Sequence, residues 1–191
     1  MTEPVIISFF TQEWEYRTRA LALGKQCDEM GIQNDIRPME STGNWLRNTA
    51  LKASFINAML QQYEHIVWFD CDGVFMARPT IVLDHAALEP VMAVPHQALP
   101  RNWQVSTISI RRTPESLALM ARWAEYARGN NVTDELAFHI VTTEMPGLVA
   151  PLPTSYCALP NRGIYPEGAV YAVGLSKSPD KMAMKARQAQ Q

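Results

Sequence analysis

The sequence predicts a single α/β domain in which helices cover a mostly parallel central sheet. Two observations lead to this prediction. The segment HIVWF at 65–69 is an almost wholly apolar run that ends in carboxylates, and such a strand can be buried only when both faces of its sheet are covered. Strand-like and helix-like segments also alternate before this run, as they do in βαβ units.

The N-terminal part of the chain predicts two strand–helix units that lead into this central strand. VIISFF at 5–10 is rich in β-branched and aromatic residues, which is typical of a buried strand. Apolar residues then recur at spacings of three and four until Gly31, which stands where a helix C-cap belongs. A short strand near 34–39 follows, and then a second helix from about Thr49 to Tyr63.

The C-terminal part predicts two more strands and two helices. The strands are VMAVPH at 91–96 and VSTISI at 105–110. The first helix has the strongest signals in the chain, because Thr113 can cap it, a proline fits its first turn and Gly129 can end it. The second helix is expected to start at Thr133.

The domain boundaries follow from the pattern near the C-terminus. We expect one domain over residues 1–176, since the chain of 191 residues shows no internal repeat and no sign of a second domain. The segment AVYAVGL at 169–175 is a candidate for the last strand of this domain. Residues 177–191 carry three lysines and one arginine against a single aspartate, which predicts a basic, flexible tail.

Composition excludes several classes of protein. With 17 basic and 19 acidic residues, the formal charge is −2 and the isoelectric point is about 6.1, so nothing indicates a nucleic-acid partner. No apolar run approaches the roughly 20 residues that span a bilayer. The three cysteines are an odd, widely spaced set, which favours a reducing, cytoplasmic location over a disulfide scaffold. The oligomeric state is not indicated.

The most informative segment is the end of the apolar run, FDCDG at 69–73. The strand delivers Asp70 and Asp72 to the edge where open α/β sheets bind ligands. Side chains two apart point the same way in an extended chain, so we expect both carboxylates to face one site. Two hard oxygen donors suit Mg²⁺ or Mn²⁺ held together with substrate phosphates. Gly73 would leave the backbone free to turn, and the alternative is that the acids only mark the end of a strand.

The string FDCDGVF at 69–75 resembles the first motif of haloacid-dehalogenase-type phosphatases. That resemblance implies that Asp70 is a nucleophile and Asp72 an acid/base. Members of this family also need a lysine further along the chain, yet none occurs between Lys52 and Lys177. Their motif normally lies on the first strand, whereas this one follows two strand–helix units. The phosphatase is therefore kept as an alternative.

A larger part of the chain resembles the GT-A type of nucleotide-diphospho-sugar transferase, the glycosyltransferases with an Asp-x-Asp motif. Five segments occur in the order and spacing typical of that family. They are ISFFTQEWEY at 7–16, NWLRNTALKASFINAML at 44–60, VWFDCDGVFMARP at 67–79, ISIRRTPESLALMARW at 108–123 and TDELAFHIV at 133–141. The resemblance implies a GT-A-like fold and a transferase that uses a nucleotide-diphosphate sugar, with UDP the expected nucleotide.

The same resemblance implies roles on the donor side of the site. Asp70 and Asp72 would hold Mn²⁺ or Mg²⁺ against the two phosphates, and Asp70 would also contact the donor. Lys52 is expected to contact the donor as well. The remaining donor contacts would come from Thr11 and Tyr16 after the first strand, and from Lys177 in the tail.

Asp134 and Glu135 are the candidates to act on the acceptor, one of them as a general base or an orienting carboxylate. The alternative is that Thr133 followed by two acids is an ordinary capped helix start. The four histidines show no ligand spacing and are expected to be structural or on the surface.

Three functions therefore remain: a metal-dependent glycosyltransferase, a haloacid-dehalogenase-like phosphatase, and a catalytically degenerate nucleotide-sugar-binding protein. The third is kept because AVYAVGLSKS at 169–178 has no histidine to serve as a metal ligand, and no glycine directly precedes VSTISI. The acceptor, the transferred sugar and the stereochemical outcome are not indicated.

Overall fold

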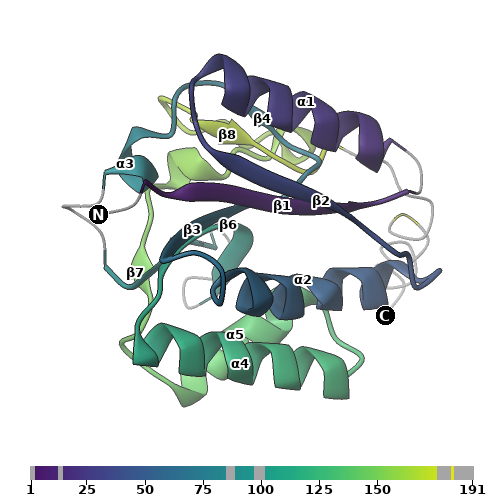
Figure 1. Ribbon diagram of the computed structural model, residues 1–191, viewed down its shortest axis with the longest axis vertical. Coiled ribbons are helices and arrows are strands. Elements are labelled where there is room, and N and C mark those ends of the chain that lie inside the picture. Colours follow the sequence, from purple (N-terminus) through teal and green to yellow (C-terminus); the bar gives the residue numbers. More distant parts are fainter. Residues whose placement is uncertain (1–2, 13–14, 85–88, 97–101, 176–181, 183–191) are drawn as a thin grey trace.

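A computed structural model describes residues 3–12, 15–84, 89–96, 102–175 and 182. Its centre is a six-stranded sheet with the strand order β2-β1-β3-β6-β5-β7 (Figure 1). The strands are β1 (Val5–Thr11), β2 (Asn34–Met39), β3 (His65–Phe69), β5 (Val91–Pro95), β6 (Trp103–Arg111) and β7 (Ala150–Pro151). Only β6 runs antiparallel to its neighbours β3 and β5, so the sheet is mostly parallel, as predicted.

Helices cover both faces of this sheet, which explains the apolar sequence of β3. One face carries α1, and the opposite face carries a layer of three helices, α2, α4 and α5 (Figure 1). Their bounds are α1 (Tyr16–Glu29), α2 (Trp45–Met59), α4 (Pro114–Gly129) and α5 (Asp134–Glu144). Strand β3 is buried over its whole length between β1 and β6, which confirms the predicted interior position.

The core is divided by the sheet into two clusters, because side chains alternate along each strand. Ile6 and Val67 pack on the side of α1. Ile7 and Trp68 pack on the side of α2, α4 and α5. This alternation determines on which face of the sheet the side chain of each residue at a strand end lies.

Helix α4 begins as predicted. The side chain of Thr113 accepts a hydrogen bond from the backbone N–H of Ser116, and the Ser116 side chain in turn accepts one from the N–H of Thr113. The prediction for α2 is wrong at both ends, since this helix begins at Trp45 and ends at Met59. The earlier start is explained by Asn44, whose side chain caps the helix by accepting from the backbone N–H of Arg47.

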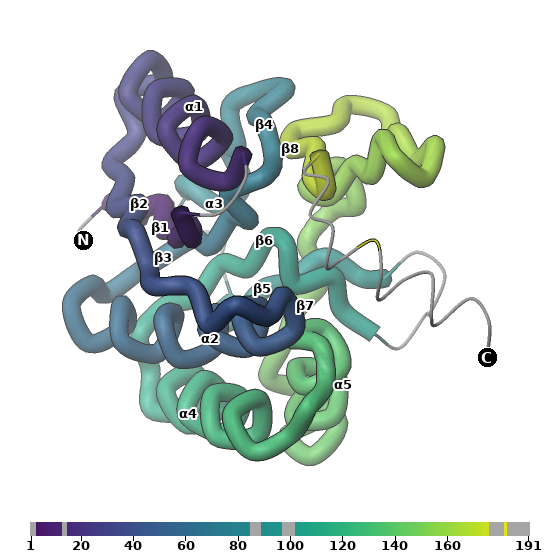
Figure 2. The backbone as a smooth tube through the Cα atoms, turned by 90° about the vertical axis from the view of Figure 1, so that its right-hand side faces the viewer, coloured from purple at the N-terminus to yellow at the C-terminus, as the bar shows by residue number. Residues whose placement is uncertain are grey.

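The remaining elements form a small layer beside α1. A second sheet pairs β4 (Val74–Phe75) with β8 (Tyr171–Ala172), and the two strands lie side by side in Figure 2. The layer also holds α3 (Thr80–Leu83) and the 3-10 turns η2 (Thr154–Tyr156) and η3 (Pro160–Arg162). The strand predicted at 169–175 is therefore only two residues long, and it does not join the main sheet.

The predicted boundary at residues 176–177 cannot be compared with the structure, because the tail, apart from Met182, lies outside the described residues. No helix in the described part of the chain is long and apolar enough to cross a membrane. All three cysteines are described, and each is buried with a free thiol.

Candidate active site

Four strand ends meet at one edge of the sheet. The parallel strands β1, β3 and β5 bring their carboxyl ends there, so Thr11, Asp70 and His96 reach the same edge. Strand β6 is antiparallel and therefore contributes its N-terminal residues, among them Gln104. This is the edge at which open α/β sheets bind their ligands.

Asp70 and Asp72 lie in a turn that starts directly after β3. The strand ends at Phe69, and the backbone N–H of Gly73 donates to the carbonyl of Asp70 at 3.2 Å. The prediction that an extended chain aligns the two carboxylates is therefore wrong, because the chain has already turned. The turn nevertheless keeps Asp70 and Asp72 close enough to repel each other electrostatically.

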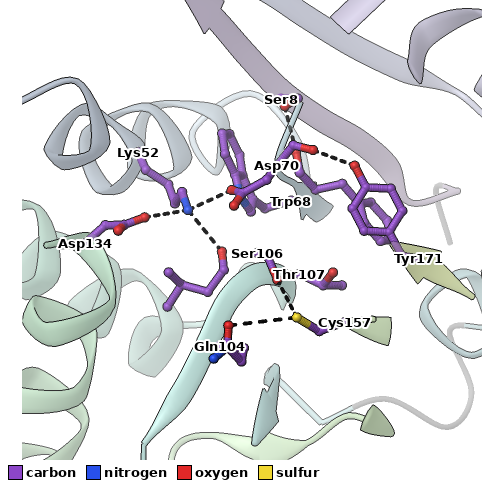
Figure 3. Close-up of polar contacts among 12 residues, drawn as sticks. Ser8, Lys52, Trp68, Asp70, Gln104, Ser106, Thr107, Asp134, Cys157 and Tyr171 are labelled. Atoms are coloured by element: carbon purple, nitrogen blue, oxygen red, sulfur yellow. Dashed lines mark hydrogen bonds and ion pairs between the residues drawn. The ribbon is translucent and has the colours of Figure 1, made fainter. Parts of the chain in front are cut away.

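The C-terminal segment holds this turn from the side of α1. The hydroxyl of Tyr171 donates to the carbonyl of Asp70 (Figure 3), and the backbone N–H of Leu175 donates to the carbonyl of Asp72. Gly73 is required for a reason that the sequence does not reveal. A Cβ at position 73 would lie 2.3 Å from the ring of Tyr171, so the glycine makes room for that ring.

Lys52 of α2 joins the turn to α5. Its Nζ lies 2.7 Å from Oδ1 of Asp70 and 2.5 Å from Oδ2 of Asp134, and it donates to the carbonyl of Val105 at 3.3 Å (Figure 3). The ring N–H of Trp68 donates to the same oxygen of Asp70 at 2.9 Å. An ammonium has three N–H groups, and each of those of Lys52 has an acceptor here.

The charges of this cluster depend on one another. Burial alone would lower the pKa of Lys52, but the carboxylates of Asp134 and Asp70 outweigh it and raise the pKa above its ordinary value. Burial raises the pKa of Asp70, and the nearby Asp72 adds to this, while Lys52 acts in the opposite direction. Lys52 therefore remains a cation, and its charge compensates the carboxylates of Asp70 and Asp134, which it contacts.

The two acids at the start of α5 have different surroundings. Asp134 is buried and its carboxylate is paired with Lys52. The side chain of Glu135 is 35% exposed and does not contact Lys52 directly. Thr133 caps the helix by accepting from the N–H of Leu136, so neither acid is needed as the cap. The segment is therefore an ordinary capped helix start, and its two acids are also free to belong to the cluster at the sheet edge.

Glu135 is in contact with two side chains from neighbouring strands. Gln104 donates from Nε2 to Oε1 of Glu135 at 3.4 Å, and Nε2 of His96 lies 3.4 Å from the same oxygen. Burial, reinforced by the negative charge of Asp134, raises the pKa of Glu135 to about 7. Burial also lowers the pKa of His96, and the positive charge of Arg162 adds to that effect.

A chain of hydrogen bonds fixes the orientation of Gln104. The hydroxyl of Ser106 donates to Sγ of Cys157 at 3.2 Å, and the thiol of Cys157 donates to Oε1 of Gln104 at 3.9 Å (Figure 3). Burial raises the pKa of Cys157 to about 11, so the thiol stays protonated near neutral pH. The amide oxygen of Gln104 is occupied in this way, and its nitrogen is directed at Glu135.

The other predicted donor residues have mixed outcomes. Thr11 is buried at the carboxyl end of β1. Tyr16 is half-buried at the start of α1 and packs against the cluster of Phe10, Ala20 and Cys71, next to the Asp70–Asp72 turn. Lys177 lies outside the described residues. The contacts of these residues to a donor remain predictions.

The carboxylates of the turn fit a metal ion only in part. The contacts of Lys52 and Trp68 with the Asp70 carboxylate both fall on Oδ1, so Oδ2 of Asp70 faces neither of these two donors. Among the described residues, no group of three His, Cys, Asp or Glu side chains could hold a metal ion. Mn²⁺ and Mg²⁺ take about six oxygen ligands. Substrate phosphates and water would therefore have to complete the shell.

Sequence reasoning missed two residues that the structure brings to the site, His96 and Gln104. A signal for His96 was present, because it is the last residue of the predicted strand at 91–96 and the carboxyl ends of parallel strands meet at one edge. Gln104 could not be found in this way, since it lies at the beginning of β6 and the antiparallel direction of that strand was not predicted.

The sequence matches no protein-family model and no curated protein. Solved structures are nevertheless similar to this fold. A glycosyltransferase involved in the glycosylation of the major capsid of PBCV-1 matches with a TM-score of 0.70 and 12% identity, over 96% of this chain and 98% of that one.

Two further glycosyltransferases match over almost the whole chain. Galactosyltransferase LgtC, solved in complex with donor and acceptor sugar analogs, has a TM-score of 0.58 and 9% identity over 97% of this chain and 94% of its own. Mouse xyloside xylosyltransferase 1 has a TM-score of 0.57 and 9% identity over 94% and 100%. The chain therefore has the GT-A fold of these glycosyltransferases, which confirms the predicted fold and gives no support to the phosphatase alternative.

Proposed function

We propose that this protein is a glycosyltransferase that moves a sugar from a nucleotide-diphosphate sugar, with UDP the expected nucleotide, to the hydroxyl of an acceptor. The observation that carries this proposal is the meeting of two groups of carboxylates at one sheet edge. The Asp70–Asp72 turn and the start of α5 come from distant parts of the chain, and Lys52 contacts both. The similarity to glycosyltransferase structures supports the same function.

On the donor side, Asp70 and Asp72 would hold Mn²⁺ or Mg²⁺ against the diphosphate. A divalent cation there would neutralise the charge that develops on the leaving nucleoside diphosphate. Thr11 at the end of β1, and Tyr16, which packs against the cluster that contains Cys71, would contact the nucleoside. Lys177 would contact the phosphates from the C-terminal segment.

Lys52 is better suited to hold the site together than to bind the donor. Its three N–H groups all have protein acceptors, so a direct contact to the donor would require one of these bonds to break. We therefore assign Lys52 the role of fixing Asp70 relative to α5.

On the acceptor side, Glu135 is a better base than Asp134. The carboxylate of Asp134 is committed to Lys52, whereas Glu135 is partly exposed and has a pKa of about 7. A base works best when its pKa lies near the working pH. Glu135 would thus take the proton of the acceptor hydroxyl as that oxygen bonds to the sugar.

The test is a panel of nucleotide-diphosphate sugars incubated with the protein and Mn²⁺ or Mg²⁺, with release of nucleoside diphosphate as the readout. We expect slow release from at least one donor with water as the acceptor, and its loss in Asp72→Asn. The control is Glu29→Gln, which removes an exposed carboxylate of α1. Tight donor binding without any turnover would instead favour the degenerate binding protein. Hydrolysis of a simple phosphate ester that depends on Asp70 would favour the phosphatase.

A further inference from the structure

His96 is a largely buried histidine that has no role in the function described so far. It directly follows β5, and its side chain is only 10% exposed. Its backbone N–H donates to the carbonyl of Asn102 at 2.8 Å, which fixes the residue close to the start of β6. From there, Nε2 of its ring lies 3.4 Å from Oε1 of Glu135.

The two contacts of Glu135 leave one of its carboxylate oxygens, Oε2, for a substrate. Gln104 and His96 both approach Oε1, one from β6 and one from the end of β5. Among the described residues, Oε2 has no such neighbour, and the side chain is partly exposed. An acceptor hydroxyl that meets Glu135 would therefore meet it at Oε2.

We infer that His96 is a positioning residue of the acceptor site, which donates from Nε2 to Oε1 of Glu135 and so favours the ionised form of this carboxylate and keeps its other oxygen directed at the acceptor hydroxyl. This inference rests on the proposed function. In the transfer step, the acceptor oxygen bonds to the anomeric carbon of the donor sugar. The bond from that carbon to the phosphate oxygen breaks, and its electron pair leaves with the nucleoside diphosphate. The proton of the acceptor hydroxyl goes to Oε2 of Glu135.

The charges around the pair are consistent with this role. Burial and Arg162 keep His96 neutral, so its ring has one N–H to donate. Asp134 and Asp70 disfavour the ionised form of Glu135, whereas Lys52 and Arg162 favour it. A hydrogen bond donated to the ionised form lowers a carboxyl pKa. Without the donor from His96, Glu135 should therefore hold its proton to higher pH.

The experiment compares His96→Phe with His96→Gln, because only the second retains a neutral N–H donor. The readout is the pH profile of nucleoside diphosphate release, with water as the acceptor and the donor that the wild type turns over. In His96→Phe we expect kcat to fall roughly tenfold at neutral pH, the acidic limb of the profile to move to higher pH, and the KM for the donor to stay unchanged. His96→Gln should restore most of the rate and move the limb back.

The matched control is His65→Gln. His65 is another buried histidine with a polar partner, Ser109, but it lies at the opposite edge of the sheet. This variant should leave the pH profile unchanged. If the wild type turns over a donor and His96→Phe has the same rate and pH profile, the inference is wrong and the proposed function is unaffected. A wild-type protein that turns over no donor would count against the proposed function itself.

A second measurement does not depend on activity. The free energy of unfolding depends on pH through the pKa of Glu135. Comparing each protein with the same protein carrying Glu135→Gln isolates this contribution. The comparison is made in the wild type, in His96→Gln and in His96→Phe. We expect the window that depends on Glu135 to lie at higher pH in His96→Phe than in His96→Gln. Identical windows in the two backgrounds would show that His96 does not act on Glu135.

Discussion

The Nζ of Lys52 lies 2.5 Å from Oδ2 of Asp134, inside the protein and between two elements that are far apart in the sequence. This ion pair attaches the start of α5 to α2, and through the second contact of Lys52 it attaches both to Asp70. Without the carboxylate of Asp134, the buried ammonium of Lys52 would retain only the charge of Asp70, and removing a partner from a buried ion pair costs much more than the loss of a surface pair.

We therefore expect Asp134→Asn to lower the free energy of unfolding by roughly 3 kcal/mol. A helix cap alone would predict a loss of only a few tenths of a kcal/mol, because asparagine retains most of the local hydrogen bonds. Urea denaturation of Asp134→Asn measures this difference, and Glu125→Gln, an exposed carboxylate on α4, serves as control. A loss below about 0.5 kcal/mol would mean that the pair contributes no more than a surface ion pair does.

Gly73→Ala tests the contact between the turn and the C-terminal segment. The new Cβ would lie 2.3 Å from the ring of Tyr171, and relieving such an overlap costs about 1–3 kcal/mol. The matched control is Gly129→Ala at the end of α4, where an added Cβ would meet nothing within 4 Å. Thermal melts of both variants should show destabilisation only for Gly73→Ala. Equal melting temperatures would indicate that the ring of Tyr171 moves aside freely.

The metal prediction concerns Asp72. If this carboxylate binds the cation that bridges the diphosphate, Asp72→Asn should weaken Mn²⁺-dependent binding of UDP more than tenfold, which corresponds to about 1.4 kcal/mol. Isothermal titration calorimetry of UDP with Mn²⁺, and again with a chelator in its place, separates the metal-dependent part. Glu29→Gln is again the control. An unchanged affinity for UDP in Asp72→Asn would mean that the two acids only mark the end of a strand and bind no cation.

The fold could be predicted from the sequence because its signals are local. The apolar run of β3, the caps of α4 and the stop at Gly31 each depend on residues close together in the chain. The antiparallel direction of β6 could not be predicted, since direction is decided by long-range pairing with β3. The start of α2 was missed because one side chain, Asn44, caps a helix that begins four residues before the expected Thr49.

For the candidate site, the sequence identified the carboxylates but not their partners. Asp70, Asp72, Asp134 and Glu135 were found because acids at strand ends and helix starts are visible in one dimension. That Lys52 neutralises two of them, and that His96 lies beside Glu135, depends on α2 and β5 reaching the same edge of the sheet. Such relationships appear only in three dimensions.

The last prediction separates Glu135 from Asp134 by the pH dependence of stability. The pKa of Glu135 is raised from 4.5 to about 7 in the folded protein, because burial disfavours its ionised form. Between these two values the folded state binds more protons than the unfolded state, so the free energy of unfolding falls as the pH rises, and this contribution levels off above about pH 7. Glutamine at position 135 cannot ionise and escapes this loss. Glu135→Gln should therefore gain stability relative to wild type as the pH is raised from 4.5 to 8, as measured by urea denaturation at both values.

Glu125→Gln, on the exposed face of α4, should show no such trend. If the difference between Glu135→Gln and wild type were the same at both pH values, Glu135 would titrate like an exposed acid, and its assignment as the base poised near neutral pH would be wrong.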